Sequence, residues 1–290
     1  MQIVQVLAYG ILLGGIYALL ASGVTLIFGV LDVVNVAQGA FLVFSALFTW
    51  QIWDTVGIEP LLLIPVMGVL MGTIGWAIYR GMLVRVVPQG PGMTVLLMFG
   101  VALTMEGILN IVFGNKFKSV TPDYFTSSVK LGDIVLPMPQ LISGVLAIVV
   151  LGGIYAYLRF SWAGRALRAS SQNRDGAALI GISHKKAAGF AFAIGAATAG
   201  VGGVLLAIMY PIFPATHYEW IARLLGVVVL GGFGSIPGAV IAALLLGTME
   251  SFASTFVPQW APLFFYGTIL LILVFRPNGI MGSKTREDVA

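Results

Sequence analysis

Long apolar runs dominate the chain, and their lengths match the thickness of a lipid bilayer. A helix needs about 20 residues to cross the roughly 30 Å hydrocarbon core. Measured against that length, the sequence predicts apolar helices at about 4–28, 37–53, 61–79, 93–113, 140–158, 187–209, 221–231, 239–255 and 262–275. Segment 221–231 is short for a full crossing, so it forms with 239–255 either two crossings or one re-entrant pair. We therefore expect an all-α, polytopic helical membrane protein with about eight or nine spans.

Glycine and proline interrupt the apolar sequence where we expect helices to end. The glycine-rich stretch 231–238 and the prolines at 258 and 262 divide the last third of the chain into three segments. Such residues are the strongest local breaks of regular structure. The polar loop 114–139 contains three more prolines, so we expect an irregular cap or a short helix there. This loop either contacts a soluble external partner or is a plain connector.

The charged residues give the chain an orientation. If the spans alternate, eleven basic residues share one side of the membrane: Arg80, Arg85, Arg159, Arg165, Arg168, Arg174, Lys185, Lys186, Arg276, Lys284 and Arg286. The other side holds only Lys116, Lys118, Lys130 and Arg223. Cytoplasmic loops of membrane proteins carry the excess of Lys and Arg. We therefore expect a protein of the cell (inner) membrane, with segment 159–186 and the C-terminus in the cytoplasm and the N-terminus outside.

Composition narrows the class of function. The 290 residues are 59% hydrophobic and only 9% charged, with a mean hydropathy of +1.02, whereas soluble domains are roughly 25% charged. These values exclude a soluble globular enzyme and a disordered chain. The net charge of +4 is better explained by cytoplasmic loops than by nucleic-acid binding. The absence of cysteine excludes disulfides and thiolate metal sites, and no histidine pair has metal-ligand spacing.

Motifs for catalysis and ATP binding are absent from the sequence. No Ser-His-Asp arrangement or G-x-S-x-G turn occurs, so no nucleophile has a recognisable base. The phosphate-binding pattern G-x-x-x-x-G-K-[ST] is also missing. We expect no enzyme activity and no cofactor, and any ATP hydrolysis must come from separate subunits.

Polar residues inside the apolar runs are candidates for function, because such residues are costly in a membrane. Asp32, Asn35 and Gln38 lie in an apolar segment between two glycines. The segment forms either a broken helix that faces a central pathway or a short cytoplasmic turn with Asp32 exposed. Glu106 and Asn110 lie one helical turn apart and share a face. They either line a pathway or hydrogen-bond between helices, so the candidate substrate-pathway residues are Asn35, Gln38, Glu106 and Asn110.

Two further segments are distinctive. The stretch 195–203 is rich in Gly and Ala, which favours close helix packing over a hinge or a smooth pathway wall. The loop 159–186 is cationic and mildly amphipathic. Asn173 or Ser171 can cap a short helix that runs to Ile180 and ends at Gly181. A small helix between two spans is either a docking knob for a soluble partner or a surface helix on anionic lipid.

Five motifs spread over nearly the whole chain carry a family resemblance. They are Arg165-Ala166-x-Arg168-Ala169 with Asn173-x-x-x-Ala177-x-x-x-Gly181-Ile182, the N-terminal stretch 15–30, Asn35-x-Ala37-Gln38-Gly39, the glycine-rich stretch 226–239, and Arg276-Pro277-x-Gly279-Ile280-x-Gly282. Together they resemble the permeases of branched-chain amino-acid ABC transporters. Two departures stand out: Gln38 replaces a histidine that is common in the family, and Glu106 stands where an amide is expected.

The resemblance implies one transmembrane permease domain over residues 1–290, similar in fold to the permeases of vitamin-B12 and ribose importers. It implies two cytoplasmic ATP-binding subunits, a second related permease or a second copy, and an external substrate-binding protein. The importer would move branched-chain or other hydrophobic amino acids by alternating access. The residues implied in ATPase coupling are Arg165, Arg168, Asn173, Asp175, Ala177, Ala178 and Gly181. The alternative is a stand-alone ion-coupled transporter that uses Glu106 or Asp32 as its carboxylate.

Overall fold

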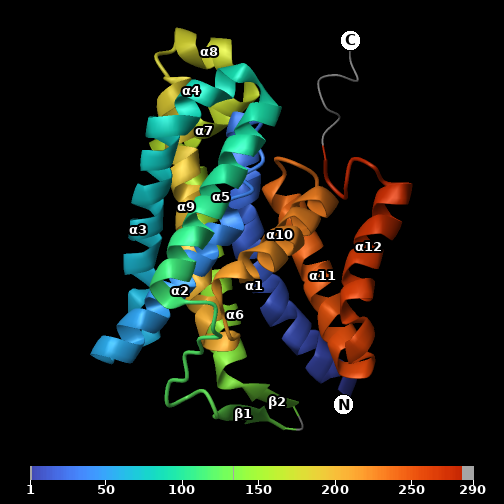
Figure 1. The fold of residues 1–290 in the computed structure, drawn as a ribbon. Helices are drawn as coiled ribbons and strands as arrows, with labels where there is room; N and C mark the ends of the chain where they lie inside the picture. The colour runs from blue at the N-terminus through green and yellow to red at the C-terminus, as the bar shows by residue number, and fades with distance from the viewer. Residues whose placement is uncertain (1, 133, 283–290) are drawn as a thin grey trace.

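The computed structural model describes residues 2–132 and 134–282. The described chain is almost entirely helical (Figure 1). Its helices are α1 (Gln2–Leu31), α2 (Gln38–Val56), α3 (Leu63–Ile78), α4 (Val84–Val86), α5 (Pro91–Phe113), α6 (Met138–Phe160), α7 (Trp162–Gln172), α8 (Arg174–Leu179), α9 (His184–Met209), α10 (His217–Gly231), α11 (Ile236–Phe256) and α12 (Ala261–Phe275). Two short strands, β1 (Ser128–Leu131) and β2 (Ile134–Pro137), complete it. The expected breaks at 231–238 and near 258–262 separate α10, α11 and α12.

The fold class predicted from the apolar runs is confirmed. Seven helical segments of the described chain are long and apolar enough to cross a membrane, and they contain α1, α3, α5, α6, α9, α11 and α12. Helix α10 has 15 residues, fewer than a crossing needs, in line with its short apolar run. Helix α2 has 19 residues and packs against α9 and α10 inside the bundle.

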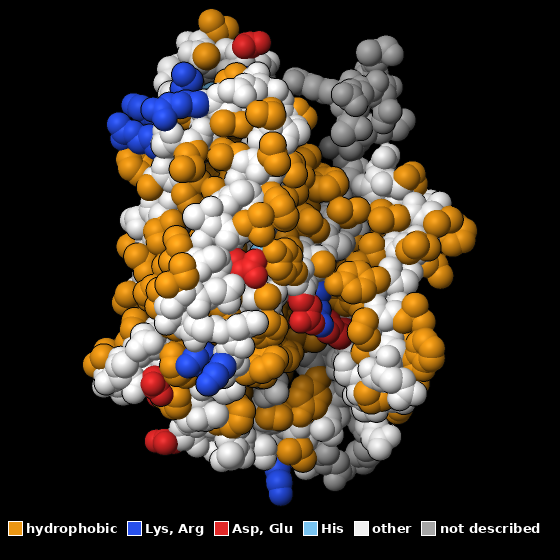
Figure 2. Space-filling view, in the orientation of Figure 1, with side chains coloured by type: hydrophobic (Ala, Val, Ile, Leu, Met, Phe, Trp, Pro, Cys, Tyr) orange, Lys and Arg blue, Asp and Glu red, His pale blue; other side chains and the backbone are white. Residues whose placement is uncertain are grey.

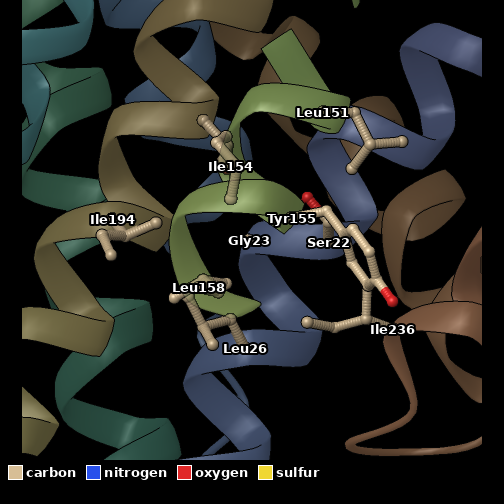
Figure 3. A pocket seen from close by; sticks show the side chains of 10 residues that line it. Ser22, Gly23, Leu26, Leu151, Ile154, Tyr155, Leu158, Ile194 and Ile236 are labelled. Carbon is tan, nitrogen blue, oxygen red and sulfur yellow. The ribbon is translucent and has the colours of Figure 1, made fainter. Parts of the chain in front are cut away.

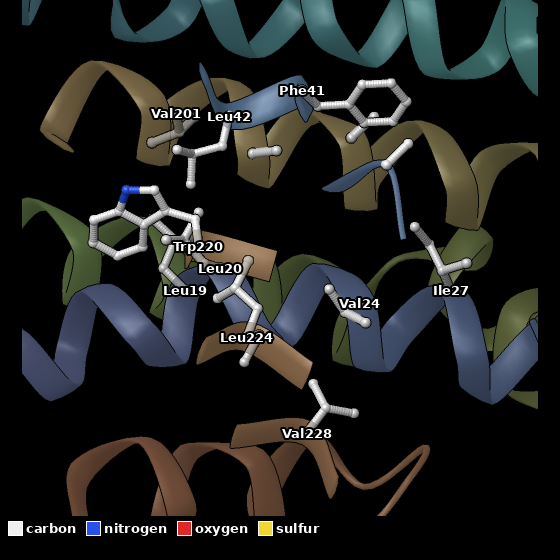
Figure 4. Packing of buried hydrophobic residues seen from close by; sticks show 14 of the residues in the cluster. Leu19, Leu20, Val24, Ile27, Phe41, Leu42, Val201, Trp220, Leu224 and Val228 are labelled. Carbon is white, nitrogen blue, oxygen red and sulfur yellow. The ribbon is translucent and has the colours of Figure 1, made fainter. Parts of the chain in front are cut away.

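Helices α1 and α9 form the centre of the bundle. Most of the apolar window of each is buried, 83% in α1 and 78% in α9, against 17% in α5 and 11% in α12. Helix α1 packs against α6, α9 and α11, while α9 packs against α2 and α3 as well. In Figure 4 the side chains of α1, including Leu20 and Val24, lie between α9 and α10. The outer helices leave a broad apolar surface (Figure 2), which suits lipid or another apolar helix.

Small residues make this packing possible, as the stretch 195–203 predicted. A Cβ added to Gly195 would clash with Ile27 of α1, and one added to Gly203 would clash with the backbone of α2. Membrane helices associate by such close packing, because lipid provides no hydrophobic drive between them. The glycines of α9 therefore serve contact between helices in this structure.

The two ends of the bundle differ in structure. Helices α7 and α8 lie at one end, where α12 also finishes; α1 begins at the other end, beside β1 and β2 (Figure 1). The loop 114–139 is irregular over 114–127, as its prolines predicted. Its second half was not expected: it forms an antiparallel hairpin in which Ser128 pairs with Pro137, with Gly132 at a φ of 65°. The β-branched residues of these strands favour extended backbone.

Candidate functional site

Asn35 and Gln38 form a hydrogen-bond network inside the protein. The Asn35 side-chain amide donates to Gln38 Oε1 over 2.9 Å, and Asn35 Oδ1 accepts from the backbone N–H of Ala37. Gln38 Nε2 donates to the Gly195 carbonyl over 2.8 Å and lies 3.4 Å from Thr198 Oγ1. Both amide side chains are fully buried. The network joins the α1–α2 connection to α9, and this geometry favours a packing role over contact with a transported solute.

Asp32 has a different environment from these amides. It ends α1 with a φ of +56°, and its carboxylate pairs with Arg174 of α8 over 2.6 Å while 74% of its side chain is exposed. Residues 32–37 are non-helical, as the flanking glycines predicted. Asp32 therefore lies in an exposed turn, whereas Asn35 is buried inside the protein; a central pathway beside this segment stays a prediction. The ion pair links the centre of the bundle to α8.

We expect Gln38→Leu to lower stability without changing the fold. Leucine cannot accept from Asn35 or donate to Gly195, and a buried polar group left without a partner costs about 1–3 kcal/mol. The melting temperature of the purified protein in detergent should therefore fall by a few degrees. Thr104→Val is a suitable control, because Thr104 is exposed and bonds only to Gly100 of its own helix. An unchanged melting temperature together with lost transport would assign Gln38 to the pathway instead.

Glu106 connects α5 to the start of α10. One of its carboxylate oxygens lies 3.1 Å from His217 Nε2 and accepts a hydrogen bond from the Tyr218 hydroxyl over 2.9 Å. The His217 side chain is buried, whereas Glu106 keeps 16% of its side-chain surface exposed. Asn110 lies one turn further along α5 and is half-buried. Of the two alternatives open for Glu106, hydrogen bonding between helices is the one this structure contains.

A second charged network lies among the apolar helices. The sequence singled out Glu250 of α11 as a polar residue near the outer end of its apolar run, but not its partners. Arg223 of α10 pairs with Glu219 of the same helix over 2.8 Å and with Glu250 of α11 over 3.3 Å. Glu250 also accepts a hydrogen bond from the hydroxyl of the buried Tyr17 in α1. The network therefore joins α1, α10 and α11. Sequence reasoning assigned Arg223 to an outer loop, although its spacing of four from Glu219 in an apolar helix was the available signal.

The predicted coupling segment contains one more helix than expected. Ser161 caps the start of α7, and its hydroxyl accepts a hydrogen bond from the Gly164 N–H. Arg165 donates to the carbonyl of Phe160, and Arg168 donates to the carbonyls of Leu158 and Arg159. Both arginines therefore hold α7 against the end of α6. In this structure the two arginine side chains stabilise the junction of α6 and α7.

Helix α8 is the exposed knob of the segment. Asn173 caps it by accepting from the Gly176 N–H over 2.9 Å, and Gly181 follows it with a φ of 81°, as the sequence predicted. Ala177 is buried, while Leu179 and Ile180 are 90% and 73% exposed. Asp175 and Ala178 also lie at the surface. Exposed apolar side chains at the tip of a short helix are typical of a docking contact.

Two hollows lie near this segment. The first is a cavity of about 10 Å³ between α1, α6 and α9, next to Tyr155 (Figure 3). It holds at most about one water molecule, so it is too small for an amino acid. The second is an open groove of about 1330 Å³ at the α8 end, lined by the ends of α1, α6 and α7 and by the loop between α10 and α11.

The apolar helix bundle, with buried polar networks and an exposed short helix, is that of a polytopic helical membrane protein. Residues 6–274 match the family described as branched-chain amino acid transport system, permease component. The chain therefore belongs to this family of permeases. The resemblance seen in the sequence motifs is thereby confirmed.

The relatives match over almost the whole chain. The high-affinity branched-chain amino acid transport system permease protein BraD of Pseudomonas aeruginosa is 28% identical, over 98% of this chain and 97% of its own length. Its counterpart LivH of Escherichia coli is 27% identical, over 97% and 96%. The high-affinity branched-chain amino acid transport system permease protein LivM of Escherichia coli is 30% identical over 41% of this chain and 28% of its own length. No solved structure matches the chain, so the likeness to vitamin-B12 and ribose permeases remains a prediction.

Proposed function

We propose that this protein is the permease subunit of an ABC importer that moves branched-chain or other hydrophobic amino acids into the cell by alternating access. Two cytoplasmic ATP-binding subunits drive the cycle. The observation that carries this proposal is α8, a capped helix that presents Leu179 and Ile180 to solvent. The full-length match to permeases named for branched-chain amino acids supports the substrate class.

The coupling route begins at α8 and continues through α7. Helix α7 contacts α1, α6 and α9, and α8 contacts α7 and α9. The Asp32–Arg174 ion pair adds a direct link between α8 and the end of α1. A partner that displaces α8 would therefore move the two central helices of the bundle. Among the predicted coupling residues, Asp175 and Ala178 are exposed and can contact an ATPase subunit. The others stabilise the structure of α7, α8 and their ends: Arg165, Arg168, Asn173, Ala177 and Gly181.

The charge distribution supports the orientation. Arg80, Arg85, Arg159, Lys185 and Arg276 belong to loops or helix ends that lie with α8 under the alternating arrangement. We place this end in the cytoplasm, since Lys and Arg are enriched there. The start of α1 and the β1–β2 hairpin then lie outside. The hairpin is the surface we assign to an external substrate-binding protein.

A second permease completes the pathway. The cavity between α1, α6 and α9 is too small for an amino acid, and the larger hollow is an open groove at the α8 end of the described chain. We therefore assign the pathway to an interface shared with the second permease. The partial match to LivM, another permease protein of Escherichia coli, supports a related partner subunit. A second copy of this chain is the other arrangement. Lipid covers the remaining apolar surface, and nothing in this proposal involves nucleic acid.

Reconstitution tests the proposed function against the ion-coupled alternative. The chain is purified alone and together with candidate ATPase and permease subunits, and each preparation is placed in liposomes with labelled L-leucine. We expect uptake only with the ATPase subunits, ATP and a loaded binding protein. Uptake by the chain alone, driven by a proton or sodium gradient, would overturn the importer and support a carboxylate-coupled transporter.

A further inference from the structure

The ion-pair network of α10 lies on an accessible face of the bundle. Figure 2 shows acidic and basic side chains at mid-height on a face that is otherwise largely apolar. Glu219 keeps 56% of its side-chain surface exposed, against 20% for Arg223 and 16% for Glu250. Helix α10 packs on α1, α2, α11 and α12, and charged groups among such apolar helices face protein or water, because contact with lipid is too costly. This face of α10 therefore borders a polar pathway or a partner subunit that encloses one.

Two ion pairs hold the guanidinium of Arg223 in place, but they do not use all of its hydrogen-bond donors. Both ion pairs end on Nη2, and no other carboxylate of the described chain pairs with this arginine. The Nε–H and Nη1–H donors therefore remain for a further acceptor, in the planar fork that fits a carboxylate. Glu250 is itself fixed by the Tyr17 hydroxyl. Glu250 and Tyr17 are thus positioning residues for the arginine.

Aromatic rings pack beside these charges: Tyr17 and Trp220 are buried, and Tyr210 is partly exposed. The Arg223 guanidinium lies 5.3 Å from the centre of the Trp220 ring. Trp220 contacts Tyr17 and Tyr210 at ring-centre distances of 6.2 and 5.9 Å, and Tyr210 is 39% exposed. A ligand with adjacent opposite charges and an apolar body would find a partner for each part here.

We propose that Arg223 and Glu219 bind the zwitterionic head group of an amino acid during transport, an inference that rests on the proposed function. The guanidinium of Arg223 donates hydrogen bonds to the substrate carboxylate, and the carboxylate of Glu219 accepts them from its ammonium group. In an α-amino acid the two charged groups sit on one carbon, and Glu219 and Arg223 likewise place opposite charges 2.8 Å apart. The apolar side chain of the substrate lies toward Tyr210, which packs on the buried Trp220.

Replacing the Glu219–Arg223 ion pair by ion pairs with the substrate changes the free energy little, and this suits a site that must bind and release its substrate. Without substrate, Glu219 and Arg223 satisfy each other, so neither charge is left unpaired at membrane depth. The zwitterion replaces one protein ion pair by two between protein and substrate. A pathway site must bind well enough to admit its substrate and weakly enough to release it.

The test uses the complete importer in proteoliposomes, with labelled L-leucine and saturating binding protein. Leucine uptake and ATP hydrolysis are measured together, because a substrate contact affects the ratio between them. We expect Arg223→Gln and Glu219→Gln to reduce the leucine moved per ATP by at least about tenfold, as the loss of a charge-assisted contact predicts. Arg223→Lys keeps the charge but loses the fork, so it should retain part of this ratio.

Glu219→Gln keeps the Arg223–Glu250 link between helices, so it remains informative if Arg223→Gln fails to assemble. Arg80→Gln is the matched control, since Arg80 also lies over a tryptophan ring, 5.1 Å from the centre of Trp76, and should leave the ratio unchanged. A parallel loss of uptake and ATP hydrolysis, or no loss in either glutamine variant, would overturn the site. A wild-type complex that hydrolyses ATP but moves no leucine would instead overturn the proposed function.

Discussion

Replacing Gly247 with leucine is expected to prevent formation of the helix bundle. Helix α1 makes its most extensive helix contact with α11, and Gly247 lies where the two backbones meet. A Cβ on Gly247 would lie 2.5 Å from the Gly14 nitrogen and 2.8 Å from the Gly10 carbonyl oxygen. These neighbours are backbone atoms, so no side-chain rotation can relieve the overlap. Because membrane helices associate by packing, we expect a loss above about 4 kcal/mol, as for other severe core lesions.

Size-exclusion chromatography in mild detergent and the melting temperature measure this effect. We expect Gly247→Leu to yield aggregated protein, and Gly247→Ala to fold with a lower melting temperature. Gly152→Leu is the matched control, because nothing lies within 4 Å of a Cβ at Gly152 in α6. A Gly247→Leu protein that elutes and melts like the wild type would show that α1 and α11 do not pack as the structure has them.

The helices of the fold could largely be predicted from the sequence, because bilayer thickness constrains their length. The run predicted at 93–113 corresponds to α5 at Pro91–Phe113, and the run at 239–255 to α11 at Ile236–Phe256. Helix α7 was missed, because its arginines made the segment resemble a loop. The hairpin was missed because prolines outweighed the alternating Val129, Ile134 and Leu136. In both cases a polar or irregular composition obscured a local structure.

The candidate site was less predictable, since it depends on contacts between distant parts of the chain. The four candidate pathway residues could be singled out because each interrupts an apolar run, and their role in a pathway stays a prediction. Their partners were not: Gln38 bonds to Gly195, and Glu106 to His217. The link from Tyr17 to Glu250 joins residues 233 positions apart, and no spacing rule connects them. Which residue of α8 points outward also depends on packing, since Ala177 and Leu179 are both apolar.

Leu179→Arg is expected to separate this permease from its ATPase partners while leaving its own fold intact. Leu179 is 90% exposed, so the substitution removes almost no contact within the chain. At a docking surface, an arginine placed in an apolar recess of the partner is left desolvated and unpaired. We expect co-purification of ATPase subunits and ATP-dependent leucine uptake to fall by at least about tenfold, or 1.4 kcal/mol of binding energy. The melting temperature of the isolated permease should stay unchanged.

Two further variants make the result specific to the tip of α8. Gln89→Arg adds the same charge to an exposed position just after α4, at the same end of the helix bundle as α8, and it should leave co-purification unchanged. Ala177→Arg introduces the charge at a buried position of α8, so it should lower the melting temperature as well as assembly. If Leu179→Arg retained its ATPase subunits and its uptake, α8 would not be the docking helix. The exposed Leu179 and Ile180 would then belong to a contact with lipid, because an apolar tip on a cationic segment also suits the membrane surface.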